Sequence, residues 1–250
     1  MERWVGKVAI VTGASSGLGA AIAEALVKQG LIVAGFARRK ERVEELAKKL
    51  EGAKGKLHAV KVDITKENEI IDGFEWVKKN LGPVHVLINN AGVARTTSLI
   101  DGETQKWKDI LDTNVLGLSI ATREAVKDMR ANNVDGHIIH INSIVGHRVI
   151  NYPGVNAYPA SKHAVTALAE TLRHEFIHNK LKIKITSLSP GHVDTEFQKA
   201  AGMKVDPNTS FSKIKGSNPE DIANGVLYVL GTPPHVQVQE LTIAGIDEPY

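Results

Sequence analysis

A tyrosine and a lysine spaced four residues apart are the first candidates for chemistry. Tyr158 and Lys162 belong to the stretch VNAYPASK, and this spacing places both side chains on one face of a helix. A free phenol has a pKa of about 10, and a neighbouring ammonium group favours the phenolate. Such a pair can exchange a proton with an alcohol or carbonyl oxygen. Ser143 directly follows the apolar run HIIHIN and supplies a hydroxyl able to hydrogen-bond the same oxygen.

The pentapeptide HEFIH, residues 174–178, matches the H-E-x-x-H signature of zinc proteases. The helix that would carry it has an apolar stripe formed by Val165, Leu168, Leu172 and Phe176. His174 and His178 fall on the opposite face, away from the core, so we predict no metal site here. This face either contacts a second subunit or is exposed to solvent.

Short runs rich in valine and isoleucine alternate with longer amphipathic segments along the whole chain. The runs lie at about 7–13, 31–36, 57–62, 84–90, 137–142, 182–189 and 236–243, and the helical segments at about 18–29, 40–50, 66–80, 103–131, 156–179 and 219–230. This alternation predicts an α/β fold, a parallel sheet covered by helices on both faces. We therefore predict a single Rossmann-like domain over residues 1–250, with a doubly wound sheet of about seven strands. Ligands of such sheets bind beyond the carboxyl ends of the strands.

The composition narrows the range of partners and compartments. The 31 Lys and Arg against 28 Asp and Glu give a net charge of +3 and are interspersed, so no nucleic-acid surface is indicated. The absence of cysteine excludes disulfides and thiolate nucleophiles and suits a reducing compartment. No apolar run reaches the roughly 18 residues of a membrane span, and the first residues carry no targeting pattern. We expect a cytoplasmic protein without membrane or nucleic-acid partners.

The stretch TGASSGLG follows the first predicted strand and precedes a predicted helix. Glycines at such a turn let the backbone approach a pyrophosphate, which the positive end of the helix attracts. An ordinary glycine-rich turn is the alternative interpretation. The spacing differs from the Walker pattern and disfavours a nucleotide triphosphatase. The expected cofactor contacts are Gly13, Ser15, Ser16, Gly17, Leu18 and Gly19.

The second predicted strand ends in Ala37, Arg38 and Arg39. A fold specific for NAD places an acidic residue here to bind the ribose hydroxyls. Alanine removes that charge, and two guanidinium groups suit a 2′-phosphate, so we predict NADP as the cofactor. The alternative is that the arginines only begin the next helix, where positive charge opposes the macrodipole.

Two further turns at strand ends are candidates for cofactor contacts. Asp63 and Ile64 follow the third strand and are placed to flank an adenine, although Asp63 could equally cap the next helix. The small residues of NNAG, after the fourth strand, would let the chain lie close to the cofactor, although the tetrapeptide could be a simple turn. The residues concerned in that stretch are Asn90, Ala91 and Gly92.

These motifs together resemble the short-chain dehydrogenase/reductase family. TGASSGLG, NNAG, the Asn114 of DTNV, the Ser143 of NSI, YPASK and SPGHVDT occur in the family's order and spacing across residues 5 to 245. The resemblance implies that Ser143 polarises the substrate oxygen and Tyr158 is the general acid or base. Lys162 would hold the nicotinamide ribose and lower the tyrosine pKa, and Asn114 would help retain a water in the proton relay. The nicotinamide side would be lined by Pro190, Gly191, Val193 and Thr195, with Thr195 near the carboxamide.

More narrowly, MERWVGKVAIVTGASSGLGAAIA, NNAGVARTTSL and NSIVGHRV are similar to the farnesol dehydrogenase-like subgroup. Residues 192–218 lack a clean period and contain scattered apolar side chains, among them Phe197, which is typical of a lid or of a disordered loop. We interpret the segment as a cover for a hydrophobic substrate, with Tyr152 and Val155 extending the wall. A surface loop without a role in specificity is the alternative.

We therefore predict an NADP(H)-dependent oxidoreductase that interconverts an alcohol and an aldehyde or ketone on a small lipophilic substrate. An isoprenoid alcohol such as farnesol is favoured, and a hydroxysteroid or general carbonyl reductase is the alternative within the family. A protein that senses NADP(H) without turnover is the alternative of another class. The resemblance further implies a homodimer or homotetramer.

Overall fold

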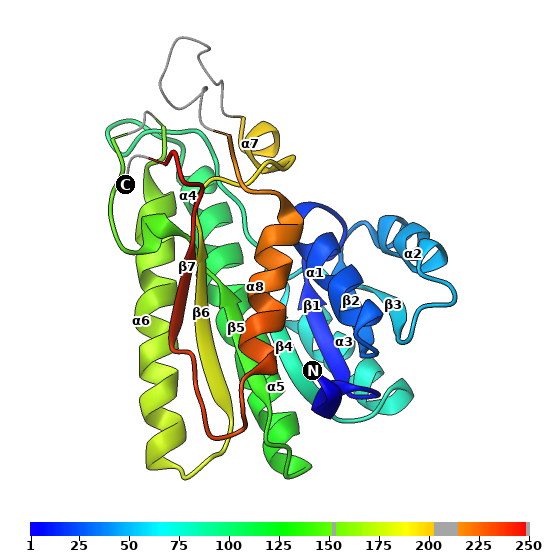
Figure 1. Cartoon of the computed structure of the whole chain (residues 1–250). Coiled ribbons are helices and arrows are strands. Elements are labelled where there is room, and N and C mark those ends of the chain that lie inside the picture. The colour runs from blue at the N-terminus through cyan, green and yellow to red at the C-terminus, as the bar shows by residue number, and fades with distance from the viewer. Residues whose placement is uncertain (152–153, 203–214, 249–250) are drawn as a thin grey trace.

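Seven parallel strands form one sheet in the computed structural model, which describes residues 1–151, 154–202 and 215–248 (Figure 1). The spatial order is β3-β2-β1-β4-β5-β6-β7. The strand order reverses between β1 and β4, where the chain crosses from β3 to β4, and this reversal defines a doubly wound sheet. The predicted fold class is confirmed. The strands are β1 (Val8–Thr12), β2 (Ile32–Ala37), β3 (Lys56–Lys61), β4 (Val84–Asn89), β5 (His137–Ile141), β6 (Lys184–Pro190) and β7 (Glu240–Ile243).

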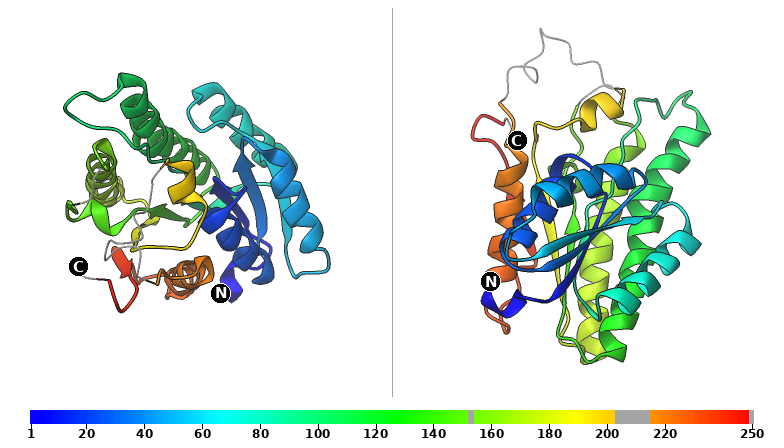
Figure 2. Two further views of the ribbon diagram at one scale, coloured as in Figure 1. Left: turned by 90° about the horizontal axis from the view of Figure 1, so that it is seen from above. Right: turned by 90° about the vertical axis from the view of Figure 1, so that its right-hand side faces the viewer.

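Helices cover both faces of the sheet (Figures 1 and 2). One face packs against α1 (Gly17–Lys28), α2 (Lys40–Lys49) and α8 (Pro219–Gly231). The other packs against α3 (Glu67–Asn80), α5 (Leu118–Ala131) and α6 (Ala157–His178). Shorter elements are the turns η1 (Glu2–Trp4), η2 (Asp112–Gly117) and η3 (Ile144–Gly146) and the helices α4 (Thr104–Leu111) and α7 (Phe197–Ala200).

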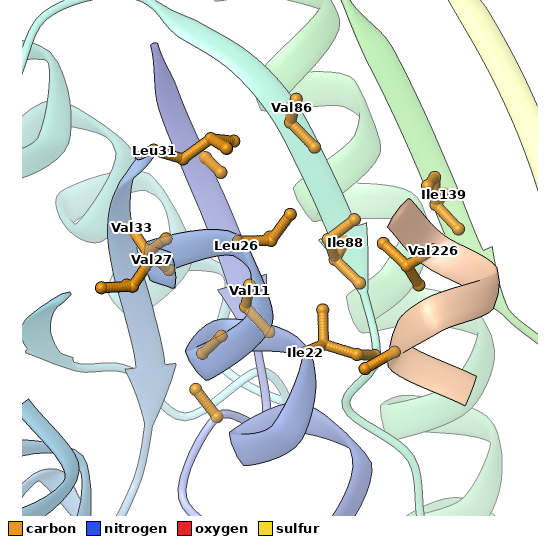
Figure 3. Close-up of a cluster of buried hydrophobic side chains, with 14 of the residues drawn as sticks. Val11, Ile22, Leu26, Val27, Leu31, Val33, Val86, Ile88, Ile139 and Val226 are labelled. Carbon is orange, nitrogen blue, oxygen red and sulfur yellow. The ribbon is translucent and has the colours of Figure 1, made fainter. Parts of the chain in front are cut away.

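The two cores follow from the alternation of side chains along buried strands. In β1, Val11 packs on the side of α1 and α8, and Ile10 packs on the side of α3 and α5. Figure 3 shows Val11 among Ile22, Leu26 and other side chains of the first core. Full burial of one such side chain contributes roughly 1.5–3 kcal/mol. Both layers therefore hold the carboxyl ends of the strands in fixed positions.

Two predicted elements differ from the observed ones. The segment at 103–131 is interrupted by the π-helical turn η2, where Gly117 lies so near the turn after β3 that a Cβ would come 2.3 Å from the Ile64 carbonyl oxygen. The last strand begins at Glu240, not near residue 236, because β6 side chains bind the preceding carbonyls. Lys184 Nζ donates to the Val236 carbonyl at 2.9 Å and Thr186 Oγ1 to that of Val238 at 2.6 Å.

Helix α6 directs the HEFIH histidines away from the core. Val165 and Phe176 are buried, while His174 and His178 are exposed. His174 Nε2 lies 2.9 Å from Glu170 Oε1, one turn earlier on the same face. Within residues 1–151, 154–202 and 215–248, no three His, Asp or Glu side chains gather to hold a metal ion. None of the helices in this part of the chain is long and apolar enough to cross a membrane.

Candidate active site

A cleft of about 540 Å³ lies at the carboxyl ends of the strands. It is lined by glycine-rich turns at one end and by Ser143, Tyr158 and Lys162 at the other. The structure brings together nearly all residues predicted for the site. Those that line the cleft are Gly13, Ser15, Ser16, Gly17, Leu18, Gly19, Arg38, Arg39, Asp63, Ile64, Asn90, Ala91, Gly92, Ser143, Val155, Tyr158, Lys162, Pro190, Gly191, Val193, Thr195 and Phe197.

The turn between β1 and α1 leaves no room for side chains at two glycines. Gly13 has φ +70°, and a Cβ there would come 2.9 Å from the Ala91 Cα. A Cβ on Gly19 would come 2.2 Å from the Gly13 carbonyl oxygen. The first turn of α1, GLGA, contains no acidic side chain, so its amide groups and positive dipole end are not neutralised locally. This turn fits a pyrophosphate, as a dinucleotide would present it.

Thr12 links the glycine turn to the NNAG turn. Its hydroxyl oxygen accepts hydrogen bonds from the backbone amides of Asn90 and Ala91, both at 3.0 Å. The Asn90 side chain donates in return to the Thr12 carbonyl at 2.9 Å. The NNAG stretch is therefore a second wall of the cleft, packed directly on the glycine turn.

The two arginines after β2 line the cleft beside the glycine turn. Arg39 Nη2 donates to the hydroxyls of Ser15 at 3.4 Å and Ser16 at 3.2 Å. Arg38 lies close enough to Asp63 for its charge to lower the pKa of that carboxyl. Both guanidinium groups thus face the cleft, although Arg39 also precedes the first residue of α2.

Asp63 does not cap α3. Its carboxylate accepts hydrogen bonds from the backbone and hydroxyl of Thr65, at 3.0 and 2.8 Å, while the helix begins at Glu67. Partial burial raises the pKa of Asp63, but the Thr65 hydrogen bonds and the charges of Arg38 and Lys66 outweigh burial and leave it lowered. Asp63 is therefore a charged acceptor at the wall of the cleft.

Ser143, Tyr158 and Lys162 converge from two elements. Ser143 follows β5, and Tyr158 and Lys162 lie on the first turns of α6. The Tyr158 and Ser143 side chains are hydrogen-bonded. Lys162 Nζ lies 5.9 Å from the centroid of the Tyr158 ring and donates to the Ile141 carbonyl at 2.9 Å. A hydroxyl, a phenol and an amine thus share the inner end of the cleft.

Burial dominates the electrostatics of Tyr158 and Lys162. Burial raises the pKa of Tyr158 above its usual value, and the hydrogen bond with Ser143 offsets only part of this effect. Burial also lowers the pKa of Lys162 to about 8. Removal from water disfavours the charged forms of both groups, and a lowering of the Tyr158 pKa by Lys162 stays a prediction.

Asn114 lies behind the cleft and does not line it. Its side-chain amide donates to the Val93 carbonyl at 2.9 Å and to Ser161 Oγ at 3.0 Å, and its oxygen accepts from the Val93 amide at 2.8 Å. Ser161 Oγ donates in turn to the Tyr158 carbonyl at 2.7 Å. The Asn114 side chain is therefore engaged in joining η2 to the start of α6.

Asn156 also positions the start of α6 and was not predicted from the sequence. It has φ +38°, and its side chain accepts from the Ala157 amide and donates to the Arg95 carbonyl at 2.8 Å. A non-glycine residue at positive φ is strained, so its surroundings must hold it there. An asparagine at the first position of a predicted helix, here 156–179, is a capping signal that could have identified it.

Apolar and polar side chains both line the substrate end of the cleft. The Phe197 ring lies on Tyr158, with centroids 5.8 Å apart, and Val155 lines the adjacent wall. Tyr152, predicted for the same wall, lies outside the described residues, as does much of the predicted loop, residues 203–214. The sequence interpretation missed further lining residues, whose signal was only their position after strands or near Tyr158: Arg95, Val145, Ile150, His192 and Gln198.

A doubly wound sheet with a glycine-lined cleft and a Ser-Tyr-Lys group defines a nucleotide-dependent oxidoreductase. The sequence profile of the family described as short chain dehydrogenase matches residues 7–206. The chain belongs to this family of oxidoreductases, which act on alcohols and use a nicotinamide cofactor.

Relatives and solved structures agree with this assignment. The chain is 51% identical to a farnesol dehydrogenase of Aedes aegypti over 100% of both proteins. It is 47% identical to dehydrogenase/reductase SDR family member 11 of Mus musculus, over 96% of this chain and 95% of that protein. The alcohol dehydrogenase of the archaeon Thermococcus sibiricus, complexed with 5-hydroxy-NADP, superposes with a TM-score of 0.83 at 29% identity, covering 98% of each chain.

Proposed function

We propose that this protein is an NADP(H)-dependent dehydrogenase that interconverts a small lipophilic alcohol and its aldehyde or ketone. The observation that carries the proposal is the convergence of Ser143, Tyr158 and Lys162 at the inner end of one glycine-lined cleft. The name of the Aedes aegypti relative supports an isoprenoid alcohol such as farnesol as the substrate. The apolar side chains of Val155 and Phe197 beside Tyr158 support the same class.

The residues at the other end of the cleft support NADP over NAD. The glycine turn would hold the pyrophosphate, and Arg38 and Arg39 would bind a 2′-phosphate, where Ala37 presents no carboxylate to the ribose. The Thermococcus sibiricus structure, described with 5-hydroxy-NADP, supports this choice. When bound, the nicotinamide supplies or accepts the hydride.

The chain's own residues would handle the proton. In the reduction direction, Ser143 donates a hydrogen bond to the substrate carbonyl oxygen, and Tyr158 transfers its phenolic proton to the same oxygen as the hydride reaches the carbon. In the oxidation direction, the phenolate accepts the hydroxyl proton as the carbinol carbon loses hydride. Lys162, when protonated, stabilises the phenolate.

The test is NADPH absorbance with a panel of aldehydes, ketones and isoprenoid alcohols, with wild type and Tyr158→Phe compared. We expect turnover by the wild type, loss of at least about 100-fold in kcat for Tyr158→Phe, and NADPH binding retained by both. Tyr228→Phe, which alters a tyrosine with 62% exposure, is the matched control and should leave turnover unchanged. Cofactor binding without turnover on the whole panel would contradict the proposal and favour a sensor of NADP(H).

A further inference from the structure

The last described turn, residues 245–248, lies at the carboxyl ends of β6 and β7 (Figure 1). Glu248 in this turn is buried, with 9% of its surface exposed. Its Oε1 accepts hydrogen bonds from the Gly245 amide at 2.8 Å and from the His192 amide at 2.9 Å. The carboxylate therefore ties the turn at 245–248 to the loop that follows β6.

The loop approaches Glu248 as closely as glycine allows. A Cβ on Gly191 would come 2.3 Å from Glu248 Oε2 and 2.4 Å from Oε1. The Gly191 amide also donates to the Ile243 carbonyl at 2.7 Å. Consecutive backbone amides of the loop, at Gly191 and His192, are thus both held by the segment that begins with β7.

The contact with Glu248 extends into the cleft. Gly191 and His192 both line it, and His192 Nδ1 lies 3.1 Å from Gln198 Nε2 in α7. Phe197, next to Gln198, places its ring on Tyr158. A displacement of the His192 backbone would therefore move both the wall of the cleft and the ring over Tyr158.

The two oxygens of the Glu248 carboxylate differ in their hydrogen bonding. Its Oε2 is buried and has no hydrogen-bond partner in the described part of the chain. A buried carboxylate oxygen without a donor costs free energy. That cost is consistent with a geometric role for Glu248.

We propose that Glu248 is a positioning residue that holds residues 191–192 in the geometry needed to bind the nicotinamide end of the cofactor and to place Phe197 over Tyr158. The effect on cofactor rests on the proposed function, whereas the hold on the loop does not. Without the carboxylate, the binding-competent loop is a minor conformation, and the apparent dissociation constant rises by the inverse of its population.

The test compares Glu248→Ala with Glu248→Gln, whose amide oxygen can still accept from both backbone amides. Asp247→Ala, at the exposed neighbouring position, is the matched control. Hydrogen exchange of the cofactor-free protein over residues 188–196 is the first measurement, and the NADPH dissociation constant with kcat and KM is the second. For Glu248→Ala we expect roughly tenfold faster exchange and roughly tenfold weaker NADPH binding. Glu248→Gln and Asp247→Ala should stay within about twofold of wild type.

Wild-type exchange and affinity in Glu248→Ala would overturn the proposal, as would equal losses in Glu248→Ala and Glu248→Gln. If Glu248→Ala does not fold, Gly191→Ala tests the same contact from the loop side, and unchanged exchange in it would also overturn the proposal. A wild type that neither binds NADPH nor turns over would refute the proposed function, while the exchange rates would still decide the role of Glu248.

Discussion

Tyr158 lies in surroundings that favour its neutral form. Burial raises its pKa, and Lys162, whose own pKa burial lowers to about 8, directs its ammonium to the Ile141 carbonyl. A neutral phenol is the form needed to donate a proton in carbonyl reduction. For alcohol oxidation the phenolate is needed, and the bound cofactor and alcohol must then contribute to its stabilisation. The protonation state of Tyr158 therefore depends on its burial and on its contact with Ser143 as much as on its spacing from Lys162.

The choice of cofactor can be tested at Arg38 and Arg39. We expect Arg38→Asp combined with Arg39→Ala to raise the NADP dissociation constant by roughly 100-fold, because two charge-assisted contacts with a 2′-phosphate are lost. The NAD dissociation constant should change by less than about threefold. Fluorescence titration with both cofactors measures this, and Arg3→Ala, remote from the cleft, is a control. Equal changes in the dissociation constants of NADP and NAD would show that Arg38 and Arg39 do not select the cofactor by binding its 2′-phosphate.

His137 and His140 make stability depend on pH. Burial, followed by the charges of Lys184 and Arg3, lowers the pKa of His137 to about 3, and burial, followed by the charge of Lys162, does the same for His140. An unfolded chain binds a proton at each histidine below a pH of about 6.5, while the folded chain does not. The stability contributed is therefore present at neutral pH and lost as the pH falls from about 6.5 towards 3.

We expect each histidine to lower the free energy of unfolding by about 2 kcal/mol between pH 7 and pH 5. Urea unfolding at both values measures it, with His140→Asn as the comparison. That variant is less stable at pH 7 but should lose about 2 kcal/mol less than wild type on acidification. Identical losses in the two proteins would show that His140 is not neutral in the folded state.

At the scale of elements, the glycine turn before α1 is the most constrained part of the cleft. A Cβ on Gly19 would come 2.2 Å from the Gly13 carbonyl oxygen and 2.5 Å from the side-chain nitrogen Nδ2 of Asn90. We expect Gly19→Ala to push the turn away from the NNAG stretch, to cost roughly 1–3 kcal/mol of stability and to abolish measurable NADPH binding.

Gly231→Ala is the matched control for that variant. Gly231 ends α8, and a Cβ there would meet no atom within 4 Å among the described residues. Calorimetry and NADPH titration on both variants make the comparison. Tight binding by Gly19→Ala would mean that the pyrophosphate does not lie on this turn.

The elements that the sequence predicts well are those with strong periodicity and strong turn chemistry. The parallel sheet, its flanking helices and the glycine turn follow from buried valine and isoleucine runs and from helix-start signals. The π-helical turn at Asn114 and the contacts of Glu248 with Gly191 and His192 depend on side chains distant in sequence. The local sequence pattern carries no information on such contacts. The residues that line the cleft could therefore be predicted from the sequence, but the residues that hold them in place could not.

At the scale of the whole molecule, the active-site cleft and the outer face of α6 lie on different sides of the same helix. Tyr158 and Lys162 face the cleft, while Ala167, Glu170 and His174 are exposed. Ile177, further along α6, is 59% exposed. A small residue in the middle of an exposed helix allows a second helix to approach closely.

We propose that this outer face of α6 pairs with the same face of a second copy, an arrangement in which two-fold symmetry buries one patch on each subunit. Light scattering should then give at least twice the chain mass of 27.1 kDa. Ala167→Arg places a long charged side chain at the centre of the patch and should give the mass of one chain, whereas Asn80→Arg, on α3, should not. Because Tyr158 and Lys162 lie on the face of α6 that lines the cleft, and not on the outer face, the monomeric variant should keep its fold. A wild type that is monomeric at micromolar concentration would instead leave this face of α6 to solvent.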